Sequence, residues 1–191
     1  QAAYGLNSRS EVNLEYMPIF TAPMDTVVDE NNADEFKKYD INICFPRNVK
    51  REPNAEDFIS VGLDGFGGLV DGEIDLNGKK ICIDVANGNM PNLHNKIKDC
   101  KNKFPKSILM AGNVASEMAY VALSVAGCDY IRVGVGSGSG CLTSVHTGVG
   151  QGMATLIQRC QSERHQRNLN SFIVADGGFK SYRDIIMALS M

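Results

Sequence analysis

The sequence predicts an α/β fold that makes up most of a (β/α)8 TIM barrel. Seven short, largely apolar runs recur along the chain, as expected for strands that are buried on both faces of a parallel sheet. Between several of these runs, apolar residues recur at helical spacing, and strands that alternate with helices are typical of βα units. Polar residues gather where the predicted strands end. An open doubly wound sheet fits the same alternation, and only the chemistry of the loops separates the two architectures.

The predicted strands indicate how much of a barrel is present. They lie at residues 18–22, 41–45, 58–63, 81–86, 108–114, 130–136 and 172–178. A complete barrel has eight strands and typically about 250 residues, whereas this chain has 191. We therefore expect one barrel domain over residues 1–191 that holds about seven of the eight strands, is incomplete at its C-terminus and belongs to a longer chain.

Four helices are predicted from apolar residues that recur every three or four positions. Their apolar positions are Leu93, Ile97, Cys100 and Phe104; Met118, Val121, Ala122 and Val125; Met153, Leu156, Ile157 and Cys160; and Ile185, Ile186 and Leu189. Ser116 is a plausible N-cap for the second helix. Residues 64–79 are rich in Gly and Asp and show no clear helical stripe, so we predict irregular structure there.

The composition is that of an ordinary globular protein and argues against several classes of partner. With 43% hydrophobic residues, 21% charged residues and a net charge of −3, the chain offers no basic face for nucleic acid or anionic lipid. No apolar run reaches the roughly 18 residues of a membrane span. The six cysteines are dispersed without a C-x-x-C pair, and the three histidines are scattered. This favours reduced thiols, a cytoplasmic location and no transition-metal cluster.

The ends of the predicted strands carry the residues that can do chemistry. They read "MDT" (24–26), "DVANGN" (84–89), "GNV" (112–114), "RVGVGSGSGCLTSVHTGVGQG" (132–152) and "DGG" (176–178). In a barrel, the carboxyl ends of all strands meet at one face, where barrel enzymes build their active sites. This convergence favours an enzyme.

Cys141 is the candidate nucleophile, because a cysteine in a glycine-rich loop near helix N-termini can be held as a thiolate. The alternative is a small buried side chain, which we expect for the other five cysteines. Thr143 could pass a proton, provided that a partner activates it. The "DGG" segment could bind phosphate and Asp176 could bind ribose hydroxyls, although turn glycines and a helix-capping aspartate explain these residues equally well. Repeated glycine carbonyls suit a monovalent cation.

Six motifs, in order along the chain, resemble the IMP dehydrogenase and GMP reductase family. They are "LNSRSEVNL" (6–14), "APMDT" (22–26), "DVANGN" (84–89), "AGNVAS" (111–116), "GVGSGSGCLTSVHTGVG" (134–150) and "ADGG" (175–178). The resemblance covers nearly the whole chain. "DVANG" and "SRSEV" look more like GMP reductases, and the chain lacks the CBS insertion that is common in IMP dehydrogenases.

This resemblance implies a (β/α)8 barrel and a covalent reaction. Cys141 would attack C2 of the purine of GMP, ammonia would leave, and hydride from NADPH would reduce the thioimidate to IMP. Thr143 matches the threonine that helps to protonate the leaving amine. The residues implied for the nucleotide are Met24, Ser139, Asp176, Gly177 and Gly178. Those implied for a potassium ion are Gly136, Gly138, Cys141 and Ser144.

The resemblance also implies a dinucleotide site. Its residues are Ser8, Arg9, Arg47, Asp84, Val85, Ala86, Asn113, Val135 and Gly136. Ser8 and Arg9 match a pair that reaches NADPH across a subunit boundary, so we expect a homotetramer. Arg47 stands roughly where the family has a lysine, and Arg and Lys are not equivalent.

Three departures from the family pattern keep other functions open. "CLTS" replaces "CTTR", so Leu142 and Ser144 stand where a threonine and an arginine are expected. The predicted third and fourth strands lack the expected helix between them, and the chain ends before the eighth strand and its glutamate-bearing loop. The favoured activity is that of a GMP reductase. The alternatives are an IMP dehydrogenase, which oxidises IMP with NAD, and a purine-nucleotide-binding relative without catalysis.

Overall fold

The computed structural model describes residues 17–138 and 143–191, in which six parallel strands form one sheet. The strands are β1 (Cys44–Phe45), β2 (Phe58–Val61), β3 (Lys80–Asp84), β4 (Ile108–Val114), β5 (Tyr130–Val133) and β6 (Phe172–Ala175). Each strand pairs with the next one in the sequence, from β1 to β6. This is the order of a barrel, because in a doubly wound sheet the strand order reverses at a switch point. The prediction of a partial TIM barrel is confirmed.

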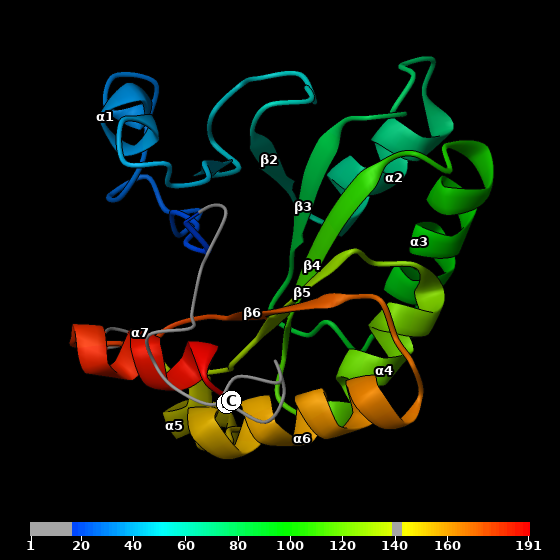
Figure 1. Cartoon of the computed structure of the whole chain (residues 1–191). Helices are drawn as coiled ribbons and strands as arrows, with labels where there is room; N and C mark the ends of the chain where they lie inside the picture. The colour runs from blue at the N-terminus through cyan, green and yellow to red at the C-terminus, as the bar shows by residue number, and fades with distance from the viewer. Residues whose placement is uncertain (1–16, 139–142) are drawn as a thin grey trace.

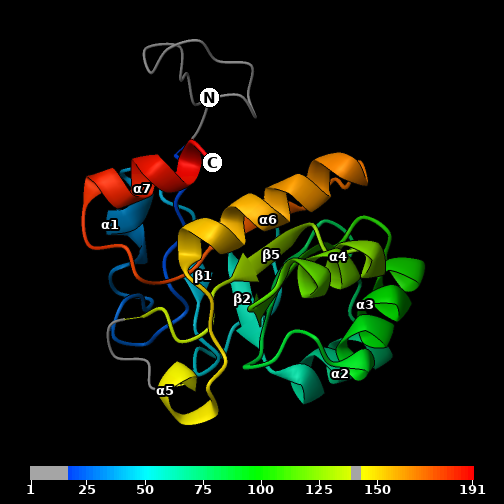
Figure 2. The same cartoon turned by 90° about the horizontal axis from the view of Figure 1, so that it is seen from below.

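Helices cover one face of this sheet (Figures 1 and 2). The described helices are α1 (Ala33–Lys37), α2 (Leu63–Asp71), α3 (Pro91–Lys103), α4 (Glu117–Ala126), α5 (Thr143–Thr147), α6 (Met153–Gln166) and α7 (Tyr182–Leu189). The crossovers from β2 to β3, from β3 to β4 and from β4 to β5 carry α2, α3 and α4 in that order, and α6 follows β5 and leads into β6. These four helices pack side by side along the outer face, as the helices of a barrel do.

The sheet curls, as three aromatic rings on its inner face show. Phe58 at the start of β2 and Tyr130 at the start of β5 have ring centroids 5.6 Å apart, and Phe20 contacts both rings at 5.8 and 5.7 Å. In a flat sheet, strands three positions apart would be separated by about 14 Å. Contact between their side chains therefore requires the sheet to bend toward its inner face.

The main core lies between the sheet and the outer helices, where two of the predicted helical stripes are confirmed. In α3, Leu93, Ile97 and Cys100 are fully buried, and Phe104 closes the same stripe. In α6, the buried positions are Leu156, Ile157 and Cys160, with Met153 packed against them.

The prediction of irregular structure over residues 64–79 is wrong in its first half, where α2 forms. Phe66 and Val70 lie one helical turn apart and are both buried against the core. Glycines at positions 65, 67 and 68 lower the intrinsic helix propensity of this segment. Burial of the two apolar side chains outweighs this low propensity. The helix that the family pattern requires between the third and fourth predicted strands, which correspond to β2 and β3, is therefore present.

One further helix, α4, differs in part from the prediction in the face that it buries. Of the predicted stripe, Val121 is buried, but Met118 and Val125 are 57% and 65% exposed. The other buried positions are Ala119, Tyr120, Leu123 and Ala126. The Tyr120 hydroxyl reaches the carbonyl of Ser171 at 2.8 Å, so its polar end is satisfied inside the core. The predicted cap is confirmed, because Ser116 accepts a hydrogen bond from the backbone N–H of Ala119.

The predicted apolar stripe of the last helix is not buried in the described structure. The helix itself forms as α7, and a capping box between Ser181 and Asp184 begins it. Ile186 and Leu189 are exposed, and Ile185 is half-buried.

The strand predicted at residues 18–22 is reduced to one isolated parallel bridge, between Phe20 and Asn42. The next position does not continue the ladder, because the Thr21 hydroxyl rather than a main-chain carbonyl accepts the backbone N–H of Cys44, at 2.9 Å. The strand predicted at residues 41–45 is accordingly shortened to β1. Within the described ranges, no helix has the length and apolarity needed to cross a membrane.

Candidate active site

Four polar residues meet where β3, β4, β5 and β6 end. Asp84 is the last residue of β3, Asn113 lies near the end of β4, Arg132 lies in β5, and Asp176 follows β6. The strands run parallel, so these positions share one edge of the sheet. A barrel therefore presents all four side chains at its carboxyl-end face.

Arg132 is the centre of this group. Its Nη1 donates to Oδ1 of Asp84 at 2.8 Å, and its Nη2 donates to Oδ2 of Asp176 at 2.7 Å. The guanidinium has a planar fork of donors, which suits simultaneous contact with two carboxylates. We call the three side chains of Asp84, Arg132 and Asp176 the arginine bridge.

The arginine bridge is buried enough for its charges to matter. Arg132 is only 8% exposed. Burial by itself would lower the pKa of Arg132, but Cys82, Asp176 and Asp84 raise it well above its ordinary value. The guanidinium is therefore a permanent positive charge between two carboxylates, and removal of one partner would leave buried charge without compensation.

A second arginine approaches the same carboxylate from the exposed side. Arg47 donates to Oδ2 of Asp84 from Nε at 3.1 Å and from Nη2 at 2.9 Å, and Nη2 also contacts the Asp84 carbonyl. Asp84 thus accepts one guanidinium on each carboxylate oxygen. The Arg47 side chain is 51% exposed, so this ion pair contributes little to stability.

Asn113 connects the arginine bridge to the loop that follows β5. Its Nδ2 donates to Oδ2 of Asp176 and to the carbonyl of Gly134, both at 2.7 Å. The preceding residue, Gly112, packs against β5 so closely that an added Cβ would lie 2.6 Å from both Cβ and O of Arg132. A glycine at this position therefore allows β4 to approach the strand that carries the arginine.

The glycine-rich loop after β5 packs directly on the "DGG" segment. Ser137 Oγ donates to the carbonyl of Asp176 at 2.6 Å. Gly177 has a φ of +84°, and a Cβ there would lie 2.9 Å from both the backbone N of Gly138 and Oγ of Ser137. Only glycine meets both requirements without strain. These loops form one wall beside the arginine bridge.

The structure brings together part of the predicted site. Arg47 bonds to Asp84, Asn113 bonds to Asp176, and Arg132 joins the two pairs into one hydrogen-bonded group. Val85 bonds through its backbone to Gly112 and Asn113. Half-buried positions of the glycine loop are Val135, Gly136 and Gly138, with Gly177 and Gly178 beside them. Ala86 is exposed, and Thr143 begins α5. Met24 is 54% exposed and is not among the side chains of this group. Ser8, Arg9, Ser139 and Cys141 lie outside the described residues.

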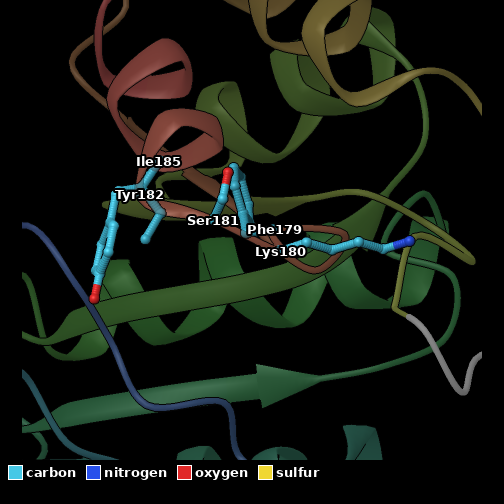
Figure 3. Close-up of a pocket in the computed structure, with 5 residues that line it drawn as sticks. All are labelled: Phe179, Lys180, Ser181, Tyr182 and Ile185. Carbon is cyan, nitrogen blue, oxygen red and sulfur yellow. The ribbon is translucent and has the colours of Figure 1, made fainter.

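A hollow of about 490 Å³ lies immediately after the "DGG" segment (Figure 3). Its lining comes from the chain that leads into α7: Phe179, Lys180, Ser181, Tyr182 and Ile185. Figure 3 shows Lys180 and Tyr182 extending in different directions from the start of the helix. The hollow does not contain the arginine bridge, so the hydrogen-bonded side chains rather than this depression define the candidate site.

Sequence reasoning missed Arg132. Its signal was present, because a charged residue in the otherwise apolar strand "YIRV" needs buried partners. Which partners it has depends on the register between β3, β5 and β6, which the linear sequence does not display.

Known proteins resemble this chain in both sequence and structure. Residues 66–191 match the family model described as the IMP dehydrogenase / GMP reductase domain. The chain is 42% identical over 110 residues to an inosine-5'-monophosphate dehydrogenase of Staphylococcus haemolyticus, which covers 58% of this chain and 22% of that protein. It is 31% identical over 211 aligned positions to a GMP reductase of Buchnera aphidicola subsp. Schizaphis graminum, which covers 96% of this chain and 60% of that protein.

The fold has a solved counterpart. The crystal structure of inosine 5' monophosphate dehydrogenase from Legionella pneumophila matches with a TM-score of 0.71 and 30% identity, over 91% of this chain and 55% of that chain. The chain thus spans 60% or less of the length of each of these three proteins. Because the family model matches more than half of the chain, the chain belongs to the IMP dehydrogenase/GMP reductase family.

Proposed function

We propose that the protein is a GMP reductase-type oxidoreductase that converts GMP to IMP and ammonia with NADPH as the hydride donor. One observation carries the proposal: Arg132 joins Asp84, on the proposed cofactor side, to Asp176, on the proposed nucleotide side, at 2.8 and 2.7 Å. Hydride transfer between two bound nucleotides needs both to be held in a defined mutual position. A buried, charge-paired bridge provides such a rigid reference. The GMP reductase relatives that align with 96% of the chain support the same choice.

The proposed reaction uses Cys141 as the nucleophile. Its thiolate adds to C2 of the purine, the bond from C2 to the amino nitrogen breaks, and the amine leaves as ammonia after it gains a proton. When bound, NADPH would supply the hydride that reduces C2, after which the carbon–sulfur bond would break and Cys141 would regain its thiolate. GMP, NADPH and two protons thus become IMP, NADP⁺ and ammonium. Thr143 is the proposed proton-transfer residue.

On the nucleotide side, Asp176 is the proposed ribose ligand. Within the described structure, Arg132 and Asn113 both donate to its Oδ2, so Oδ1 is the oxygen that we assign to the ribose hydroxyls. Gly177 and Gly178, together with Ser139, are proposed to hold the phosphate through the wall formed with the glycine loop. Met24 is proposed to line the nucleotide pocket.

On the cofactor side, the proposed contacts surround Asp84. They are Arg47, Asp84, Val85, Ala86, Asn113, Val135 and Gly136, with Ser8 and Arg9 supplied across a subunit boundary. Arg47 is half-exposed and pairs with Asp84. Its guanidinium is proposed to bind a cofactor phosphate, for which the fork of N–H donors is suited.

A potassium ion is proposed at the glycine loop, with Gly136, Gly138, Cys141 and Ser144 as its ligands. The described residues fit this ion, because Ser144 Oγ lies 3.4 Å from the carbonyl oxygen of Gly136 and two hard oxygen donors therefore meet there. Such an ion would hold the loop in the shape that presents Cys141.

The remaining proposals concern the whole protein. We propose a cytoplasmic homotetramer in which residues 1–191 belong to a single barrel domain without a CBS insertion. Sedimentation analysis of the purified natural protein tests the tetramer, and a dimer or monomer at assay concentration would contradict it.

The activity is tested by offering the natural protein two substrate pairs and recording the absorbance of the reduced cofactor. We expect GMP to cause oxidation of NADPH with release of ammonia, and the Cys141→Ser variant to lose this turnover. Formation of NADH from IMP and NAD, without turnover of GMP, would replace the proposal by an IMP dehydrogenase. The 42% identity to a dehydrogenase over 110 residues is the observation that favours this second candidate. Binding of GMP without turnover of either pair would indicate a non-catalytic relative.

A further inference from the structure

Two buried cysteines lie on the inner face of the sheet, below the arginine bridge. Cys44 in β1 and Cys82 in β3 belong to one buried cluster with Phe58 and Met110. Cys44 is 1% exposed and Cys82 is fully buried. The inner face is the lumen of the barrel, so these sulfur atoms lie beneath the candidate active site rather than behind the sheet.

Cys82 contacts the arginine bridge directly. Arg132 Nη1 lies 3.9 Å from Sγ of Cys82, and the same nitrogen donates to Asp84 at 2.8 Å. Nη1 thus has a carboxylate acceptor at the strand end and a sulfur acceptor deeper in the lumen. Because the two acceptors lie on the same strand two residues apart, they share one face of β3.

Further polar atoms support Cys82 from the neighbouring strands. Ser60 is its register partner in β2, and Ser60 Oγ lies 3.6 Å from Sγ of Cys44. Thr21 accepts the backbone N–H of Cys44 and so holds β1 in place. A small group of hydroxyl and thiol side chains therefore lies under Arg132, in a lumen that is otherwise lined by apolar residues.

The protonation behaviour of the pair agrees with this contact. A hydrogen bond from Cys44 and the charge of Arg132 lower the pKa of Cys82 against the effect of burial, while Ser60 lowers it further and Asp84 raises it. The hydrogen bond to Cys82, followed by burial, raises the pKa of Cys44. The contact with Arg132 thus favours the thiolate form of Cys82.

Other described cysteines behave differently. Cys100, Cys128 and Cys160 are buried, and burial raises the pKa of each. All five described cysteines are buried, so the expectation of small buried side chains is confirmed for each of them. Cys82 differs from the other four in that its sulfur accepts from a charged partner, Arg132.

We propose that Cys82 is a positioning residue for the arginine bridge: its sulfur accepts from Arg132 inside the barrel and holds the guanidinium where it reaches both Asp84 and Asp176. Without this acceptor, Arg132 keeps its hydrogen bonds to Asp84 and Asp176 but loses the contact that fixes how far its guanidinium lies inside the barrel. Both carboxylates then shift relative to the loops that surround them. The inference rests on the proposed function, because it assigns the bridge to ligand positioning.

The test compares three substitutions of Cys82 in the natural protein, with Cys160→Ala as the matched control for loss of a buried thiol. Cys82→Ala removes the acceptor and its volume, Cys82→Val restores volume without an acceptor, and Cys82→Ser keeps an acceptor. We expect the Kd for IMP and the KM for GMP and NADPH to rise about 3- to 10-fold in the Ala and Val variants, as for loss of one hydrogen bond. In Cys82→Ser these values should stay within about twofold of the parent, and kcat should change little in all variants.

The outcomes are distinguishable. IMP is a ligand of both the proposed reaction and its dehydrogenase alternative, so the IMP pattern can hold even when GMP fails to oxidise NADPH. That result would refute the GMP reductase assignment and support the role of Cys82. A Cys82→Val variant that binds IMP as the parent does would reduce Cys82 to a packing residue and overturn the inference, as would a Cys160→Ala variant with the same loss.

Discussion

Replacement of Arg132 by methionine gives the most direct test of the arginine bridge. The change keeps a long, unbranched side chain but removes both hydrogen bonds to Asp84 and Asp176. The two carboxylates then face each other at the strand ends without the charge that lies between them. We expect a large loss of stability as well as weaker binding of both nucleotides.

The magnitude follows from the burial of the three side chains. Removal of one partner of a buried ion pair costs about 3–5 kcal/mol, because the other partner keeps an uncompensated charge. The Arg132 side chain is 9% exposed, but the carboxylates are 26% and 27% exposed, and Asp84 retains Arg47. The lower limit of about 3 kcal/mol therefore applies, which lowers Tm by about 6–12 °C in a domain of this size.

Urea unfolding followed by circular dichroism measures this loss, with Arg159→Met as the control. Arg159 is 57% exposed and pairs with Glu117 at 3.9 Å, so its replacement should cost less than about 0.5 kcal/mol. The double variant Arg132→Met with Asp176→Asn removes one of the unpaired charges and should cost about 1–2 kcal/mol less than the sum of the single variants. Strict additivity, or a cost for Arg132→Met no greater than that of the control, would refute the bridge.

Three further predictions concern other contacts. Gly112→Ala places a Cβ 2.6 Å from the neighbouring strand and should lower the free energy of unfolding in urea by about 1–3 kcal/mol. Its control, Gly68→Ala in α2, has open space around the added Cβ and should raise that free energy by about 0.5–1 kcal/mol. Equal effects of the two variants would contradict the close approach of β4 and β5. Tyr120→Phe removes a buried hydrogen bond and should lower the free energy of unfolding by about 1 kcal/mol. The Tyr182 side chain is 86% exposed, so Tyr182→Phe should leave the free energy of unfolding unchanged. If the two variants have the same Tm, the Tyr120 hydroxyl does not contribute to stability. In the folded protein the pKa of Cys82 is lowered from its ordinary 9.0. The Cys82 thiolate therefore stabilises the folded state fully at pH values above 9.0, and this stabilisation is lost as the pH falls through the lowered pKa. The stability advantage of the parent over Cys82→Ser should therefore grow as the pH rises through this window, and denaturation series that run parallel at every pH would contradict the lowered pKa.

The local pattern of the chain predicted elements whose signal does not depend on distant residues. Leu93, Ile97 and Cys100 form a strict helical stripe in a polar background, so both the helix and its buried face could be predicted. The helix α2 could not be predicted, because its glycines have low helix propensity. It forms because packing of Phe66 and Val70 overrides that low propensity. Apolar residues occur all around α4, so periodicity could not choose between the face with Met118 and the face with Tyr120.

The same division applies to the candidate site. Asp84, Asn113 and Asp176 were recognisable because each follows or ends an apolar strand, and parallel strands bring such positions to one edge. Arg132 and Cys82 could not be recognised in this way. Their roles depend on the contact between them and on carboxylates that lie far away in the sequence. A strand shows which of its residues are polar, but it does not show which residue of another strand they meet.

The alternation of strands and helices, the family motifs and the polar strand ends could thus be predicted from the linear sequence. These features are local, and backbone geometry and hydrophobic periodicity set them within a few residues. The curl of the sheet, the close approach of β4 to β5 at Gly112, and the buried guanidinium that joins two carboxylates above a cysteine became visible in the folded chain. Burial and charge pairing depend on the register of several strands at once, and the energies that select this register act between residues that are remote in the sequence.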